Sequence, residues 1–318
     1  MLETSHIAFF LVNQHKKLYK YSEREHLVNK ANAKQNPVKT AEREGKKAAK
    51  QAAYSPLMER LTRLGYAVKG FLYVAIGFIA IAGALGKSKT PADQFGAINT
   101  FARLPNAEIL LWIFLIGFIS YSLWGVIRAV LDPLHKGTDI KGLLTRAGYL
   151  VSAATYASLG WVTYEMIRGV RHAASSNSTV QMVSKIMSMP MGRWLVGAIG
   201  VAAILAGLYQ IYSGIKQNYD EVLKPYALSP EQLRIARQVG RYGTIARGIV
   251  FALVGFFFAL AAWQANPGHA QGFNGALKYL EKQPYGIYLL LIVALGLIAF
   301  GIYSFMSAAW FRPRRQAS

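Results

Sequence analysis

Long apolar stretches without a charged side chain follow one another from residue 70 onward, separated by short charged or polar segments. A helix rises about 1.5 Å per residue, so roughly 20 residues span the hydrocarbon core of a bilayer. Backbone groups in lipid must pair within their own segment, which favours helices over isolated strands. The pattern therefore predicts six transmembrane helices. They are Gly70–Leu85, Ile109–Ile127, Ala147–Tyr164, Trp194–Ile215, Gly248–Trp263 and Tyr285–Phe311.

The apolar stretches form a pair that recurs three times along the chain. Each copy begins with an arginine two residues before a glycine, at Arg63, Arg146 and Arg241, with spacings of 83 and 95 residues. The matched positions within the copies are Gly77, Gly160 and Gly255 in the first helices, and Tyr121, Tyr209 and Tyr303 in the second. Two spans per copy give every copy the same orientation. We expect an all-α membrane protein of three parallel two-helix repeats with pseudo-threefold symmetry, packed at these glycines and tyrosines.

The chain divides into four segments on this basis. Residues 1–54 are rich in Lys, Glu, Ala and Gln, which predicts a basic cytoplasmic arm that is partly helical or disordered. The three repeats then occupy 55–135, 136–224 and 225–318, the last with a short basic tail. Ser55-Pro56 and Ser229-Pro230 predict capped helix starts, because Ser caps helices and Pro suits their first turn.

The net charge of +21 is distributed unevenly across the predicted membrane. Of the 36 Lys and Arg residues, 27 lie on the side that holds the N-terminal arm, the loops between repeats and the C-terminal tail. This bias predicts that both termini are cytoplasmic in a bacterial inner or plasma membrane. The basic segments should therefore meet anionic lipids of the cytoplasmic leaflet, and nucleic acid is not the expected partner.

Residue patterns that carry chemistry are few. The sequence has no cysteine, and its six histidines show no spacing that would bring two onto one helix face. Phosphate-binding loops and a Gly-x-Ser-x-Gly nucleophile motif are absent, and no Asp or Glu falls inside a span. We therefore expect no catalytic residue, metal or cofactor, and no enzyme activity.

Two basic residues at the start of apolar stretches are candidates for an anion site. Lys69 and Arg247 each lie six residues after the leading arginine of their repeat, and Ser152 holds that position in the second repeat. Together with Arg63, Arg146 and Arg241 they could bind an anionic solute or a lipid headgroup. Alternatively, Lys69 and Arg247 extend to the interface and only anchor their helices.

The pattern Arg-x-Gly-Tyr-x-x-(Lys/Arg)-Gly, clearest at 63–70, resembles a bacterial membrane-protein family catalogued as domain of unknown function 1206. The resemblance covers about residues 57–312 and implies three copies of a two-helix unit in one chain. The second repeat departs from the pattern, with Ser152-Ala153 in place of the basic residue and glycine. The family has no assigned activity to carry over.

The absence of catalytic patterns favours a scaffold, assembly or stress-related membrane protein. The alternative is a small transporter or channel that carries an anionic or small polar solute along the pseudo-threefold axis. A membrane enzyme acting on lipid is a third possibility, and it would require polar side chains that converge near one interface. The sequence predicts no particular protein partner.

Overall fold

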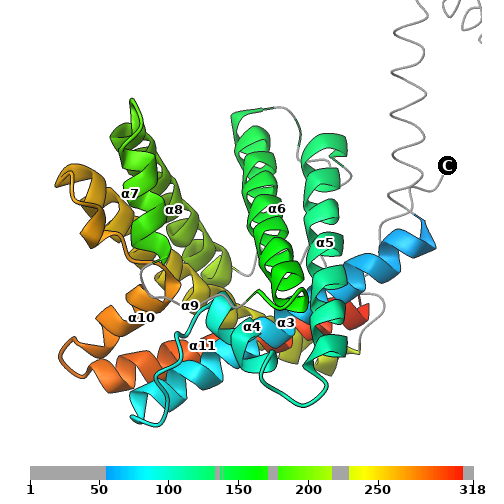
Figure 1. Ribbon diagram of the computed structural model, residues 1–318. Helices are drawn as coiled ribbons and strands as arrows, with labels where there is room; N and C mark the ends of the chain where they lie inside the picture. Colours follow the sequence, from blue (N-terminus) through cyan, green and yellow to red (C-terminus); the bar gives the residue numbers. More distant parts are fainter. Residues whose placement is uncertain (1–54, 133–136, 138, 171–177, 217–228, 311–318) are drawn as a thin grey trace, which may run out of the picture. The chain divides into compact units, whose positions relative to one another are not determined.

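The computed structural model describes residues 55–132, 137, 139–170, 178–216 and 229–310, and these contain helices and no strand (Figure 1). The predicted N-terminal arm and the basic C-terminal tail lie outside the described residues. The helices are α3 (Pro56–Ala84), α4 (Gln94–Phe101), α5 (Ala107–Leu131), α6 (Ile140–Ile167), α7 (Ser178–Met187), α8 (Gly192–Lys216), α9 (Pro230–Trp263), the 3-10 turn η3 (Pro267–His269), α10 (Phe273–Glu281) and α11 (Gly286–Trp310).

A long helix, a short helix and a second long helix follow one another three times, as α3–α4–α5, α6–α7–α8 and α9–α10–α11. The predicted starts of α3 and α9 are confirmed. Ser55 accepts a hydrogen bond from the Met58 N–H at 3.2 Å, and Ser229 forms a capping box with Gln232. The short helices were not predicted, because their few apolar residues lie among polar ones.

The same turn begins the second long helix of every repeat. A proline is followed by a non-glycine residue in the left-handed region, at Asn106, Met191 and Tyr285, with φ of 58, 64 and 59°. The next N–H donates to the carbonyl three residues earlier, at 3.2, 2.9 and 2.8 Å. Left-handed backbone is uncommon for such residues, so its recurrence shows that the three repeats share a local conformation.

Five helices, α3, α5, α8, α9 and α11, are long and apolar enough to cross a membrane. They mark the chain as a multi-pass membrane protein. The predicted span Ala147–Tyr164 lies in α6, which has 28 residues but is not among the five, because Ser, Thr and Tyr side chains interrupt its apolar sequence. The prediction of six spans is therefore confirmed for five of them by length and composition.

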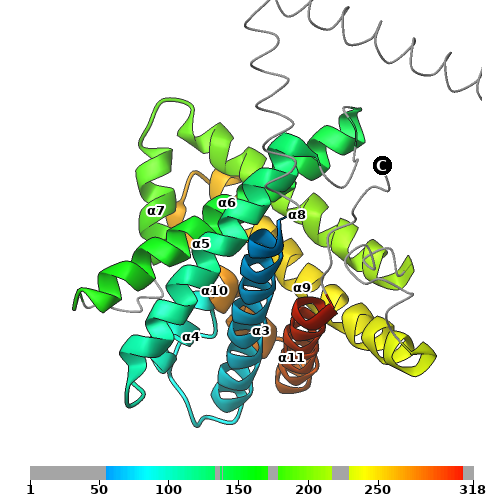
Figure 2. The same ribbon diagram turned by 90° about the vertical axis from the view of Figure 1, so that its right-hand side faces the viewer.

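The second long helix of each repeat packs against the first long helix of the next. The pairs are α5 with α6, α8 with α9, and α11 with α3 (Figures 1 and 2). At two of these junctions glycines meet. A Cβ on Gly70 would lie 2.9 Å from the Gly301 carbonyl oxygen, and one on Gly248 would lie 2.7 Å from that of Gly207. At the third junction Ala153 replaces the glycine, and its carbonyl accepts a hydrogen bond from Ser122.

The predicted packing glycines lie further along the same junctions. A Cβ on Gly77 would clash with Ile298 of α11, and one on Gly255 would lie 2.5 Å from the backbone nitrogen of Ile204 of α8. Gly160 is less tightly enclosed, because the nearest atom, Phe118 Cβ, would be 3.6 Å away. Small residues at these positions let the helix backbones approach closely.

The shared turns correct one predicted match between the repeats, that of Tyr121 with Tyr209 and Tyr303. Counted from the shared turns, Tyr209 and Tyr303 both lie 17 residues after the first residue of their helix, and in α5 that position is Trp124. Tyr121 lies three residues earlier. Because residues three apart occupy the same face of a helix, matching by residue type alone produced a shift of about one turn.

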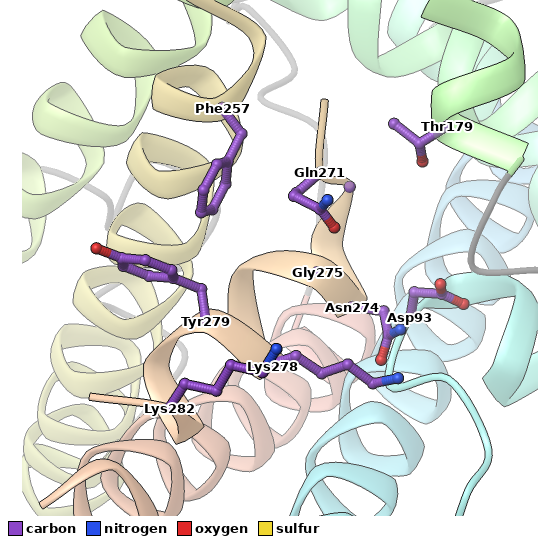
Figure 3. A pocket seen from close by; sticks show the side chains of 10 residues that line it. Asp93, Thr179, Phe257, Gln271, Asn274, Gly275, Lys278, Tyr279 and Lys282 are labelled. Carbon is purple, nitrogen blue, oxygen red and sulfur yellow. The ribbon is translucent and has the colours of Figure 1, made fainter. Parts of the chain in front are cut away.

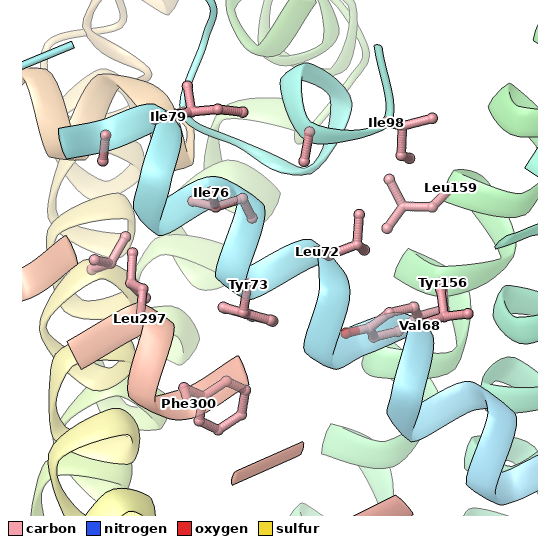
Figure 4. Close-up of a cluster of buried hydrophobic side chains, with 14 of the residues drawn as sticks. Val68, Leu72, Tyr73, Ile76, Ile79, Ile98, Tyr156, Leu159, Leu297 and Phe300 are labelled. Atoms are coloured by element: carbon pink, nitrogen blue, oxygen red, sulfur yellow. The ribbon is translucent and has the colours of Figure 1, made fainter. Parts of the chain in front are cut away.

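The main hydrophobic core surrounds α3, whose Leu72 and Ile76 are fully buried (Figure 4). Leu297 and Phe300 of α11 cover one side of α3, and Tyr156 and Leu159 of α6 approach it from another. By contrast, α6 and α8 barely contact each other although they belong to the same repeat. The first and third repeats therefore form most of the buried interior.

Candidate functional site

Three cationic side chains lie together among the long helices: Lys69 of α3, Arg128 of α5 and Arg247 of α9, hereafter the cation cluster. Lys69 is 7% exposed and Arg128 is 8% exposed. Arg247 is half-buried, and its Nε is enclosed. In the part of the chain that the structure describes, no carboxylate lies within ion-pair distance of any of the three. An uncompensated buried ion costs several kcal/mol.

Aromatic rings connect the three cations. Lys69 Nζ donates to the Tyr121 hydroxyl at 3.1 Å and lies 4.9 Å from the centre of the Phe300 ring. The guanidinium of Arg247 lies 4.7 Å from the same Phe300 ring. The guanidinium of Arg128 lies 5.7 Å from the Tyr121 ring. Lys69 therefore shares one ring with each arginine, and the three positive charges are neighbours.

These ring contacts do not fully compensate the charges. A cation over an aromatic face gains about 0.5–2 kcal/mol, which is less than the cost of removing an ion from water. The Nε atoms of Arg128 and Arg247 also have no hydrogen-bond partner. Charge-assisted hydrogen bonds from such donors to an anion would satisfy both the charge and the open N–H groups.

The helix junctions orient Lys69 and Arg247. Each directly precedes a junction glycine, Gly70 or Gly248, whose close backbone contact sets the rotation of α3 or α9. Successive residues differ by about 100° around a helix, so the preceding cation points to one side of the junction. That side carries Phe300 for both residues. The spacing that made Lys69 and Arg247 candidates in the sequence thus brings them together.

The other predicted site residues lie elsewhere. Arg63 pairs with Glu59 on its own helix at 2.7 Å, and Arg241 is exposed on α9. Arg146 donates to the carbonyls of Ala129 and Val130 at the end of α5, at 2.6 and 3.2 Å. Ser152 is partly exposed on α6. The leading arginines therefore lie at helix ends and surfaces, apart from the cation cluster.

Sequence reasoning missed Arg128 as a member of the site. Its guanidinium lies 4.4 Å from the ring of Tyr149, the aromatic residue that opens the second repeat, so Arg128 supplies a cation where that repeat carries Ser152. The sequence held one signal. Arg128 precedes three apolar residues that continue α5, whereas Lys216 is the last residue of α8.

A cavity of about 260 Å³ lies where the short-helix segments of the three repeats meet, and we call it the short-helix pocket (Figure 3). Asp93 comes from the first repeat, Thr179 from the second, and Asn274 and Lys278 from the third. The Asn274 side chain accepts a hydrogen bond from the Ala92 N–H at 2.9 Å, which ties α10 to the start of α4. The pocket is thus built from all three repeats.

Asp93 is the acidic group of this pocket. Burial raises the pKa of its carboxyl, and N–H groups of Gly96 and Phe95 and the charge of Lys278 partly oppose that rise. Figure 3 shows the Lys278 side chain extending towards Asn274 and Asp93. Among the described residues, no group of three His, Asp or Glu side chains lies close enough together to bind a metal ion.

Comparison with known proteins agrees with the repeat. Residues 64–132, 147–217 and 242–310 each match the family model described as Domain of Unknown Function (DUF1206). The chain is also 32% identical over 255 residues to an uncharacterized protein, YxxB, of Bacillus subtilis (strain 168). That alignment covers 80% of this chain and 92% of the relative. No solved structure matches.

Proposed function

Since the chain belongs to the DUF1206 family, which confirms the triplicated unit but brings no activity, we propose that it is a multi-pass protein of a bacterial plasma membrane that binds a small anion in the cation cluster. The supporting observation is that the buried Lys69 and Arg128 and the half-buried Arg247 lie together without a carboxylate among the described residues. We propose binding, and no catalytic step, for this site.

The proposal includes a sixth span. The α8–α9 junction has the same glycine contacts as the α11–α3 junction, so α9 and α3 should run in the same direction through the membrane. Because α5 and α8 both cross between α3 and α9, these two helices share a direction only if α6 crosses as well. Six helices then form a pseudo-threefold ring, and the excess of Lys and Arg places both termini in the cytoplasm.

The ligand should carry a carboxylate or a phosphate group. Such groups accept charge-assisted hydrogen bonds from lysine and arginine, and arginine can bind them through two parallel bonds. A free solute and the headgroup of an anionic lipid share this chemistry. The burial of Lys69 and the enclosed Nε of Arg247 argue against simple anchoring at the membrane surface.

A solute-binding membrane protein fits the expected transporter or channel class better than a scaffold, because a scaffold does not need three neighbouring cations that have no carboxylate partner among the described residues. The scaffold or assembly role stays a prediction. It becomes the preferred interpretation if the cluster binds no anion.

The test is the double variant Lys69→Gln/Arg247→Gln, compared with Lys216→Gln/Arg234→Gln, which removes two exposed cations from α8 and α9. In detergent, added phosphate or a small dicarboxylate should raise the unfolding temperature of the parent and of the control, and should leave the cluster variant unchanged. Without added anion, the cluster variant should unfold at a higher temperature, because two uncompensated buried charges are gone.

Native mass spectrometry separates the two ligand sources. An anionic lipid that co-purifies with the parent and the control but not with the cluster variant identifies a headgroup site. A response to the soluble anions in lipid-free protein identifies a solute site. If the cluster and control variants behave alike in all of these measurements, the anion proposal is wrong.

A further inference from the structure

Tyr73 of α3 lies between the cation cluster and Phe273, a neighbour of residues that line the short-helix pocket. Its ring is 3% exposed and lies 4.7 Å from the Phe300 ring, centre to centre. On the cluster side, the Arg247 guanidinium lies 5.9 Å from the Tyr73 ring. On the pocket side, the Phe273 ring lies 6.3 Å away. Tyr73 thus contacts the cation cluster on one side and, on the other, a residue next to the pocket lining.

On the pocket side, the residue that contacts Tyr73 is a direct sequence neighbour of residues that line the pocket. Phe273 is the first residue of α10, between Gly272 and Asn274, which both line the pocket. The Tyr73 hydroxyl also lies near the side chain of Gln94, which follows the pocket residue Asp93. Tyr73 is therefore packed against the start of α10 and lies near the start of α4, next to residues that line the pocket.

The short-helix pocket has more basic than acidic side chains, which favours the entry of an anion through it. Lys278 and Lys282 lie one turn apart on α10 and both line the cavity, where Asp93 is the one acidic residue among the lining residues. Like charges at this spacing repel each other on a helix, and an anion bound between them would relieve that repulsion.

The pocket is also large enough for such a ligand. A water molecule occupies about 30 Å³ in the liquid, so a cavity of about 260 Å³ holds several waters or one small solute.

We infer that the short-helix pocket is the entrance to the cation cluster, and that Tyr73 is the barrier between them. The occupant is a small anion with a carboxylate or phosphate group. It is first held by Lys278 and Lys282 and then reaches Lys69 and Arg247 when the Tyr73 ring moves aside. This inference rests on the proposed anion binding at the cluster.

The natural absence of cysteine supplies a direct test, since any introduced cysteine is the sole thiol of the chain. Ser304→Cys places that thiol one turn after Phe300 on α11, at a position that is 2% exposed. Two membrane-impermeant methanethiosulfonate reagents, one with a sulfonate and one with a trimethylammonium group, are applied separately to each face of proteoliposomes. The accessibility of an N-terminal tag shows which face of the protein is on the outside of the vesicles.

We expect slow labelling with Tyr73 in place. Tyr73→Ala should speed labelling several-fold from the short-helix side alone, and the sulfonate should react roughly tenfold faster than the ammonium reagent because cations line its route. Tyr73→Phe keeps the ring and removes the hydroxyl near Gln94, so its rate should fall between the two. Phe78→Ala, an exposed aromatic of the same helix, is the matched control and should change nothing.

The possible failures are distinguishable. If Tyr73→Ala does not speed labelling from the short-helix side while phosphate still stabilises the parent protein, the entrance is wrong and the anion proposal stands. If Tyr73→Ala speeds both reagents equally, the route exists without anion preference and the proposed function fails. An equal gain from both membrane faces would mean general loosening and would overturn the barrier. Should Tyr73→Ala not fold, Tyr73→Phe and Gln94→Ala must still speed labelling from that side.

Discussion

Asp93 caps α4, where its carboxylate accepts a hydrogen bond from the Gly96 N–H at 2.8 Å, and burial raises its pKa. Because the pKa of Asp93 is higher in the folded protein than in the unfolded chain, the unfolded chain loses this proton at a lower pH. Between the two pKa values the folded protein therefore binds more protons, and a rise in pH favours unfolding. We predict that the free energy of unfolding falls as the pH rises from the ordinary value near 3.8 through the raised pKa, and that Asp93→Asn removes this fall while keeping the cap.

Thermal unfolding in detergent across that pH range measures the effect. Asp139→Asn, which changes an exposed cap of the same kind at the start of α6, is the matched control. A constant difference between Asp93→Asn and the parent at every pH would contradict the prediction.

At the level of residues, the sequence located two members of the cation cluster and missed the third. Lys69 and Arg247 recur at one repeat position, so their shared place could be predicted. Arg128 has no cationic counterpart in the structural register, where Ser213 and Ser307 hold its position in α8 and α11. A buried cation at this position therefore does not recur in the other repeats. The short-helix pocket was equally hidden, because it depends on how three loop segments meet.

Individual helices depend on small residues where they cross. Gly207 of α8 lies so close to α9 that a Cβ would be 2.6 Å from the Gly248 carbonyl oxygen. Gly148 of α6 has no such neighbour within 4 Å. We predict that Gly207→Ala destabilises the protein by about 1–3 kcal/mol through overpacking, whereas Gly148→Ala is neutral or stabilises by up to about 1 kcal/mol through helix propensity.

Reversible unfolding in mixed micelles gives both values on one scale. The same reasoning ranks the predicted packing glycines: Leu should be worst at Gly77 and Gly255 and mildest at Gly160. Equal losses for Gly207→Ala and Gly148→Ala would remove the link between close approach and stability.

For the elements, apolar length and the capping residues were sufficient to place the long helices and the starts at Ser55 and Ser229. They did not reveal α4, α7 and α10. Helices of eight to ten residues with mixed polarity resemble loops in sequence and are marginal alone, so tertiary contacts decide them. The shift from Tyr121 to Trp124 has a related cause, since a one-turn error preserves the buried face.

The arrangement of the whole molecule depends on whether five or six helices cross the membrane. Labelling of single-cysteine variants can decide between the two. We predict that Gly137→Cys, between α5 and α6, is labelled only from the cytoplasmic face, and that Ser184→Cys on α7 is labelled only from the opposite face. The prediction follows from the proposed crossing of α6 between them. Labelling of both thiols from one face would mean that α6 does not cross and that the threefold ring is wrong.

The α11–α3 junction has a consequence for how the protein is made. About two hundred residues separate these helices, so α3 leaves the ribosome long before its closest partner exists. At roughly 5–20 residues per second, the interval lasts on the order of ten seconds or more. During that time Gly70 and Gly77 have no α11 against them, and Lys69 has no Phe300. Completion of the last helix is therefore the event that encloses the first, and a chain truncated after α9 should expose α3 to membrane quality control.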